Sequence, residues 1–208
     1  MVKDKSMEDT ISNAKTSVSN PSNESTSAKN TVTESEEKEQ HKEDTLKELK
    51  KFFIKSVQDI YYAEHEIQEK LGDIKNKATS EALEDSLEDH QLITKKQILR
   101  LEKVFKLLNE TPKKNKCEAI VGILKEGDEM ISQTKDKSTL RDIAIILACQ
   151  KVEHYEIATY NGLIQLAVTL NLDKVVQLLE TTYEEEEDTD HLLNDIMEED
   201  IFITNDQE

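Results

Sequence analysis

Glycine and proline are scarce in this chain, whose 208 residues include four glycines and two prolines. Most β-sandwiches and β-barrels need more of both residues, because these folds contain many tight turns. Tryptophan is absent, and aromatic residues make up only 4% of the sequence. The composition therefore predicts an all-α fold with a few long helices, and the length suits one domain of ordinary size.

Cysteine is scarce too, since the chain contains only Cys117 and Cys149 and has no Cys-x-x-Cys spacing. This pattern argues against a disulfide scaffold and against a thiolate zinc site. Met1 leads into polar sequence instead of an apolar leader. No stretch approaches the ~18 continuous apolar residues of a membrane span. We therefore expect a cytoplasmic protein with free thiols and no membrane association.

Positive charge is outnumbered, with 27 lysines and arginines against 45 aspartates and glutamates and a formal net charge of −18. A chain this acidic repels phosphate backbones, so we expect no nucleic-acid partner. Cations are the natural small partners of such a surface. Solubility alone also accounts for the surface charge as a whole.

The N-terminal segment, residues 1–44, is dominated by polar and charged residues. It has too few large apolar residues to offset the entropy lost on folding, so we expect a disordered tail. Thr45-Leu46-Lys47-Glu48 has the spacing of a capping box and predicts the start of the first helix. The folded domain is therefore expected to span residues 45–203.

Apolar residues in that domain recur three and four positions apart, which is the spacing of helices that pack on one face. The expected helices span 46–71, 81–109, 117–133, 139–170 and 173–202. The first two and the last two have short connections, so each pair should form an antiparallel hairpin. The hairpins are joined by about 28 residues that carry the short third helix, as in the crossover of ferritin-like four-helix bundles.

Polar side chains interrupt the apolar stripe of each of the four long helices. These positions are Glu64, His90 (with Gln97 two turns later), Glu153 and Glu186. A buried carboxylate costs several kcal/mol unless a cation, a proton or a partner accompanies it. Carboxylate and imidazole in a bundle core suit iron, manganese or zinc.

The four positions also lie at similar depths in the expected bundle. Glu64 lies 8 residues before Gly72, and His90 lies 10 residues after Ser80. At ~1.5 Å per residue, the members of each hairpin differ in level by only about 3 to 5 Å. Any single one of these residues also fits a solvated or salt-bridged acid in so acidic a chain, and that alternative stays open.

Three neighbouring features bear on the same layer. Glu156 lies three residues after Glu153 and can reach the same cavity. His154 lies one residue off the stripe, so we expect a supporting or surface role. Asp188 and His191 have an acid-x-x-His spacing, but both rotate away from the stripe and should be exposed.

Five segments of the domain, in order, resemble the YciF-like stress proteins, which are ferritin-like helical proteins of bacteria. They are Asp59-x-x-Tyr62-Ala63-Glu64, Gln97-x-x-Arg100-Leu101-Glu102-x-Val104-Phe105, Lys116-Cys117-x-Ala119 with Gly122, Arg141-Asp142-Ile143-Ala144 followed by Gln150-Lys151-Val152-Glu153-His154-Tyr155-Glu156-Ile157-Ala158-x-Tyr160, and Leu178-Leu179 with Glu184-Glu185-Glu186 and Thr189-Asp190. The resemblance covers about residues 46–196, and the tail has no counterpart in it.

The resemblance implies a ferritin-like bundle, a homodimer and a dinuclear metal centre between the helices. The matching positions implied as metal ligands are Glu64, His90, Glu153, Glu156 and Glu186. The chain departs from the family pattern at Ile93, where a carboxylate usually follows the histidine by three residues.

Two hypotheses follow. In the first, the protein is a metal-binding ferritin-like stress protein that handles iron, manganese or peroxide. In the second, it is a non-catalytic stress or interaction protein whose metal site is degenerate and whose buried acids are satisfied by hydrogen bonds or protons. Whether the protein is an enzyme does not follow from the sequence.

Overall fold

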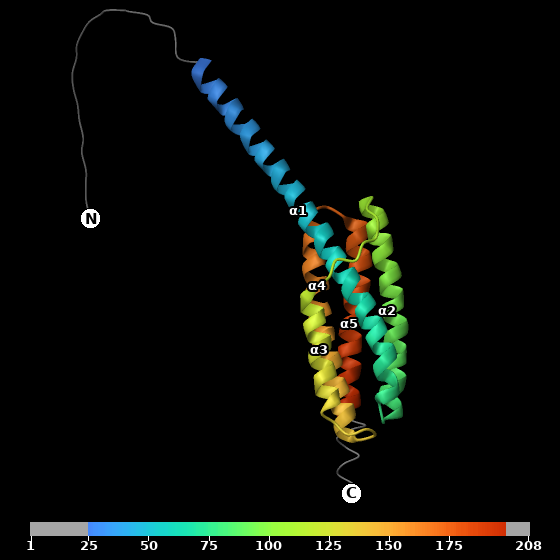
Figure 1. The fold of residues 1–208 in the computed structure, drawn as a ribbon. Coiled ribbons are helices and arrows are strands. Elements are labelled where there is room, and N and C mark those ends of the chain that lie inside the picture. The colour runs from blue at the N-terminus through green and yellow to red at the C-terminus, as the bar shows by residue number, and fades with distance from the viewer. Residues whose placement is uncertain (1–24, 199–208) are drawn as a thin grey trace, which may run out of the picture. The chain divides into compact units, whose positions relative to one another are not determined.

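The computed structural model describes residues 25–198, and these residues contain helices and no strand. The helices are α1 (Ser25–Ile74), the single 3₁₀ turn η1 (Lys75–Lys77), α2 (Glu81–Leu108), α3 (Glu118–Ser132), α4 (Thr139–Thr169) and α5 (Asp173–Asp195) (Figure 1). The predicted all-α fold is confirmed.

The bundle consists of α2, α4, α5 and the part of α1 that follows Asp44, because the residues from Asp44 onwards form one compact unit. α1 and α2 form one antiparallel hairpin, and α4 and α5 form the other (Figure 1). α4 packs on α5, and α2 also packs on α5. The four helices therefore enclose a common core.

The crossover between the hairpins carries α3. After α2 the chain passes over α1, where the Asn115 N–H donates to the Gln58 carbonyl at 3.2 Å. α3 then runs back along α4, so that α2 and α4 point the same way (Figure 1). This is the ferritin-like connection that the loop lengths predict.

Local signals fix most helix ends close to the predicted positions. The Ser80 hydroxyl accepts a hydrogen bond from the Leu83 N–H at the start of α2, and Ser138 caps α4 through the Arg141 N–H. α2 ends where Asn109 adopts a left-handed conformation with φ 58°. Asn171, with φ 55°, separates α4 from α5. Asparagine tolerates this conformation better than most residues.

The two outer ends differ from the prediction. α1 already begins at Ser25, so Thr45 lies inside it and the predicted capping box is wrong. Residues 25–44 contain no glycine or proline, and residues 34–44 are rich in glutamate and lysine, which favour helix, so this composition outweighs one local capping signal. The part of the predicted disordered tail before residue 25 lies outside the described residues. At the other end α5 stops at Asp195, and the end predicted at Phe202 also lies outside them.

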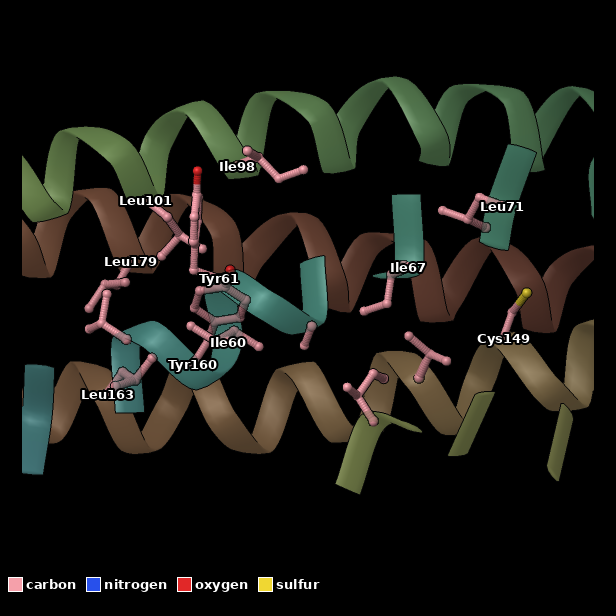
Figure 2. Close-up of a cluster of buried hydrophobic side chains, with 14 of the residues drawn as sticks. Ile60, Tyr61, Ile67, Leu71, Ile98, Leu101, Cys149, Tyr160, Leu163 and Leu179 are labelled. Carbon is pink, nitrogen blue, oxygen red and sulfur yellow. The ribbon is translucent and has the colours of Figure 1, made fainter. Parts of the chain in front are cut away.

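Large apolar side chains from all four long helices fill the core (Figure 2). Tyr160, Phe53 and Phe105 are among the largest fully buried side chains. The ring of Tyr61 meets that of Phe105 edge to face, with centroids 5.3 Å apart. Among the described residues, no helix combines the length and the apolarity that crossing a membrane requires.

Candidate metal centre

The bundle core contains a layer of acids and one histidine. Glu64 comes from α1, His90 from α2, Glu153 and Glu156 from α4, and Glu186 from α5. All five side chains are buried, with exposed fractions of 3% or less. Glu153 and Glu156 point to the same side because residues three apart share one face of a helix.

Four of these five residues form a compact group. His90, Glu153, Glu156 and Glu186 each offer one ligand atom, and these atoms all lie within 4.8 Å of one another. Glu64 is not a member of this group. Its Oε1 accepts a hydrogen bond from the Tyr160 hydroxyl, while its Oε2 remains without a partner.

Most of the polar atoms in this layer lack hydrogen-bond partners. Within the described part of the chain, both ring nitrogens of His90 and both carboxylate oxygens of Glu153 are buried and unpaired, as are Glu156 Oε1 and Glu186 Oε2. Buried polar groups in native proteins nearly always have a partner. Such a concentration of unpaired lone pairs is the arrangement that a cation requires.

The carboxyl groups are held towards their protonated forms. Burial raises the pKa values of Glu64, Glu153 and Glu156 well above the ordinary value, and the neighbouring charge of Glu186 raises them further. Burial also raises the pKa of Glu186 to about 8, although Arg100 and the Gln97 side chain favour its charged form. Without a cation, this layer therefore takes up protons near neutral pH.

His90 shifts in the opposite sense. Burial lowers its pKa to about 4, so its imidazole is neutral at pH 7. Neutral imidazole is the form that binds a metal. The Nε2 atom of His90 lies 3.6 Å from Glu153 Oε1, so the nitrogen and the carboxylate face the same space.

The donor set fits a transition metal. One imidazole nitrogen with carboxylate oxygens suits iron, manganese or zinc, and the absence of thiolate from the group disfavours softer metals. Glu64, Glu153, Glu156 and Glu186 together carry four negative charges when ionised, which matches two divalent cations. The residues therefore fit the implied metal, with Glu64 as the additional carboxylate.

Two polar side chains on α2 hold α5 in place beside this layer. Gln97 Nε2 donates to Glu186 Oε1 at 2.7 Å. Arg100 makes two hydrogen bonds of 2.8 Å to the carboxylate of Glu185, and its NH1 group also donates to Thr182 Oγ1. The position of Gln97 on the apolar stripe signalled its burial. The Arg100–Glu185 pair has no comparable signal, because each residue alone resembles an ordinary surface charge.

The neighbouring features divide between surface and core. Asp188 and His191 are exposed, as predicted, and His154 is exposed with its Nε2 3.7 Å from Asp190 Oδ1. Asp190 itself is partly buried, and its Oδ1 lacks a hydrogen-bond partner. Asp190 belongs to the Thr189-Asp190 part of the family resemblance, but helical spacing assigned it no role because it lies off the main stripe. Ile93 is partly buried on α2, one turn after His90.

Comparison with known proteins places this arrangement in a family. Residues 48–204 match a family model described as "Domain of unknown function (DUF892)". The chain is 38% identical to Protein YciF of Escherichia coli (strain K12) over 152 residues, which is 73% of this chain and 91% of that protein.

Three solved structures share the fold. The E. coli stress protein YciF superposes with a TM-score of 0.68 at 36% identity, covering 71% of this chain and 93% of that one. YcfI from Rhodopseudomonas palustris gives a TM-score of 0.68 at 40% identity, covering 70% and 92%. A Xanthomonas campestris protein at 20% identity shares the fold alone, with a TM-score of 0.60 over 77% and 99% of the two chains. The chain therefore belongs to the YciF-like family of ferritin-like stress proteins.

Proposed function

We propose that this protein is a stress protein that binds iron or manganese in the core of its bundle. The observation that supports the proposal is the set of buried, unpaired ligand atoms on His90, Glu153, Glu156 and Glu186. Leaving several such atoms without partners costs free energy that a bound cation recovers. A stable core would otherwise place apolar side chains at these positions.

Charge balance favours two metal ions. Four ionised carboxylates neutralise two divalent cations, and Glu64 supplies the fourth carboxylate outside the compact group. The Tyr160 hydroxyl fixes one oxygen of Glu64 and leaves the other free to bind. We therefore expect the first ion at the compact group and the second beside Glu64.

The protein's own residues prepare this site. Gln97 orients Glu186 through its 2.7 Å hydrogen bond, and Tyr160 orients Glu64. The surrounding apolar side chains exclude water, which strengthens every electrostatic interaction in the layer. Bound iron or manganese would supply Lewis-acid and redox chemistry there.

Elemental analysis tests the proposal directly. The full chain is purified after growth with added iron and manganese, and metal per chain is measured for the wild type and for Glu153→Gln. We expect about two equivalents in the wild type and a large loss in the variant, because an amide is a poor replacement for a carboxylate as a metal ligand. Glu180→Gln is the matched control, since it makes the same change at an exposed position of α5. Less than about 0.1 equivalent of metal per chain in the wild type would contradict the proposal.

The second candidate function is that of a non-catalytic interaction protein with a degenerate site. Ile93, which stands where the family pattern has a carboxylate, favours this alternative. In that case the glutamates are buried as neutral acids, as their raised pKa values allow. Metal would then leave the thermal stability of the wild type unchanged, and Glu153→Gln would melt at the same or a higher temperature.

We also propose that the protein forms a homodimer. Leu92 and Leu99 lie seven residues apart on α2 and are 53% and 51% exposed. Residues seven apart share one face of a helix, so these side chains form an apolar pair on the outside of the bundle. We infer that this pair forms part of the contact with a second copy, which would remove both side chains from water.

A further inference from the structure

A narrow apolar pocket leads to the candidate metal centre. Its walls are formed by α1, α3 and α4, and His90 and Glu153 lie among its lining residues. The other lining residues include Ile67 and Leu71 of α1 and Cys149 of α4, which lie at one end of the buried cluster in Figure 2. The pocket thus places apolar walls beside two of the proposed ligands.

The outer end of the pocket is marked by an ion pair. Lys70 of α1 and Asp128 of α3 both line the pocket, and their side-chain atoms lie 2.7 Å apart. These two side chains are 27% and 46% exposed, whereas His90 and Glu153 are 3% and 0% exposed. The pocket therefore extends from partly exposed residues at the surface to fully buried ones at the core.

The size of the pocket restricts what can occupy it. Its volume is about 30 Å³, which is two to three times the ~10–15 Å³ that holds one water molecule. The pocket is narrow because α3 lies close to α4, where a Cβ atom added at Gly127 would lie 3.1 Å from the Ala148 Cβ. Only a molecule of two or three heavy atoms fits.

The chemistry of the walls restricts the occupant further. Between the ion pair and the core, side chains such as Ile67, Leu71 and Val152 offer no hydrogen bonds. Apolar cavities of this kind stay dry and bind small apolar molecules. Along this apolar stretch water or hydrogen peroxide would lose its hydrogen bonds, which costs several kcal/mol, and only the unpaired atoms of His90 and Glu153 at the inner end would replace them.

We propose that this pocket binds dioxygen and admits it to the metal centre. The inference rests on the proposed function, because a gas pocket ending at His90 and Glu153 serves a metal bound there. It extends that function by naming the small molecule: dioxygen is diatomic and apolar, and it fits both the volume and the walls. α3 acquires a role as well, since this crossover helix forms the outer wall.

Dioxygen itself is the probe for the test. It is paramagnetic, so it broadens the NMR signals of methyl groups that it approaches. Metal-free full-length protein with labelled methyl groups is compared under dioxygen and under nitrogen. We expect the methyls of Ile67, Leu71 and Val152 to broaden on the order of threefold more than those of Leu163 and Leu179, which are equally buried but lie outside the pocket.

Two variants that fill the pocket sharpen the test. Ala148→Leu adds volume from α4, and Leu124→Phe adds volume from α3. The matched control is Ala158→Leu, which adds the same side chain at an exposed position of α4. We expect both filling variants to abolish the excess broadening and the control to retain it. Circular dichroism checks folding, and Leu124→Phe decides the matter if Ala148→Leu does not fold.

The outcomes separate this inference from the metal proposal. Equal broadening of pocket and reference methyls in the wild type would overturn the dioxygen pocket, whatever the metal content. Excess broadening that persists in a folded filling variant would overturn it too. The NMR measurement uses metal-free protein, so its result does not depend on the metal proposal. Pocket-specific broadening together with no metal in the purified chain would contradict the proposed function and not the dioxygen pocket.

Discussion

At the scale of single residues, each glutamate of the core is either protonated or bound to a cation. Burial disfavours their charged forms, and the charge of Glu186 raises the pKa values of Glu153 and Glu156 further. A metal reverses this preference, because it binds the ionised form. Metal binding should therefore release protons at neutral pH.

Glu186 leads to a prediction about pH. Its pKa in the folded protein, about 8, lies above the ordinary value of 4.5, so ionisation of the unfolded chain lowers stability as pH rises towards 8. His90, with a folded-state pKa of about 4, acts in the opposite sense only below its ordinary value of 6.5. Above pH 6.5, of these groups only the carboxyls change the stability with pH. Urea unfolding of the metal-free protein should show stability falling between pH 6.5 and 8, by about 1 kcal/mol per pH unit for each such carboxyl.

The control for this prediction is Glu186→Gln, which cannot ionise. Its stability should fall less steeply over the same pH interval, because one of the raised-pKa groups is gone. Saturating metal should also flatten the wild-type profile. A metal-free wild type whose stability is constant or rises from pH 6.5 to 8 would contradict the proposed protonation.

The buried positions of the site residues were predictable from sequence, but their partners were not. Helical spacing alone assigns Glu64, His90, Glu153 and Glu186 to buried faces, and Glu156 follows from the three-residue interval. The hydrogen bond from Tyr160 to Glu64 depends on which side chains two packed helices bring together. Periodicity gives the face of a helix and leaves the facing residue open.

At the scale of helices, Asp142 links the beginnings of two of them. Its carboxylate oxygens accept hydrogen bonds from the Thr79 N–H at 2.7 Å and from the Ser80 N–H at 3.1 Å. Asp142 belongs to the first turn of α4, while Ser80 caps α2. This one side chain therefore ties the two parallel helices together at the same end.

We expect Asp142→Asn to destabilise the protein by about 1–3 kcal/mol, because an amide group can replace only one of the two acceptor oxygens. Urea unfolding measures the loss. Asp173→Asn is the matched control, since Asp173 lies in the first turn of α5 but is exposed. It should lose only the weak attraction to its helix end, well under 1 kcal/mol. Equal losses of unfolding free energy in the two variants would contradict the proposed link between α2 and α4 through Asp142.

Helix ends were predictable where the sequence supplies a strong local signal. Ser80 and Ser138 cap the starts of α2 and α4. The left-handed residues Asn109 and Asn171 lie just after the ends of the same two helices. The start of α1 was not predictable in this way. There, the helix-forming composition of residues 25–44 continues through Thr45, so the apparent cap does not interrupt the helix.

At the scale of the whole molecule, the exposed leucines of α2 predict self-association. Sedimentation velocity should show a dimer for the wild type and a monomer for the double variant Leu92→Glu, Leu99→Glu. Buried charges without partners would destabilise the interface. Helical content should stay unchanged, since both side chains point outwards. A monomeric wild type, or a dimeric double variant, would contradict the proposed homodimer.

The wiring of the bundle was predictable because connection lengths constrain it. Short links allow only antiparallel neighbours, and the long link before Thr139 leaves room for a return along the bundle. The connection lengths do not show which helices the crossover covers. The hydrogen bond from Asn115 to Gln58 shows that it passes over α1. α3, which follows, packs on α4.

The crossover also divides the donor set between two halves of the chain. The hairpin before it carries Glu64 and His90, and the hairpin after it carries Glu153, Glu156 and Glu186. A metal ion bound by residues of both hairpins would crosslink the two halves of the chain. A chain cut between Glu110 and Asn115 should therefore dissociate into its halves in a chelator and reassemble when metal returns, which gel filtration would follow.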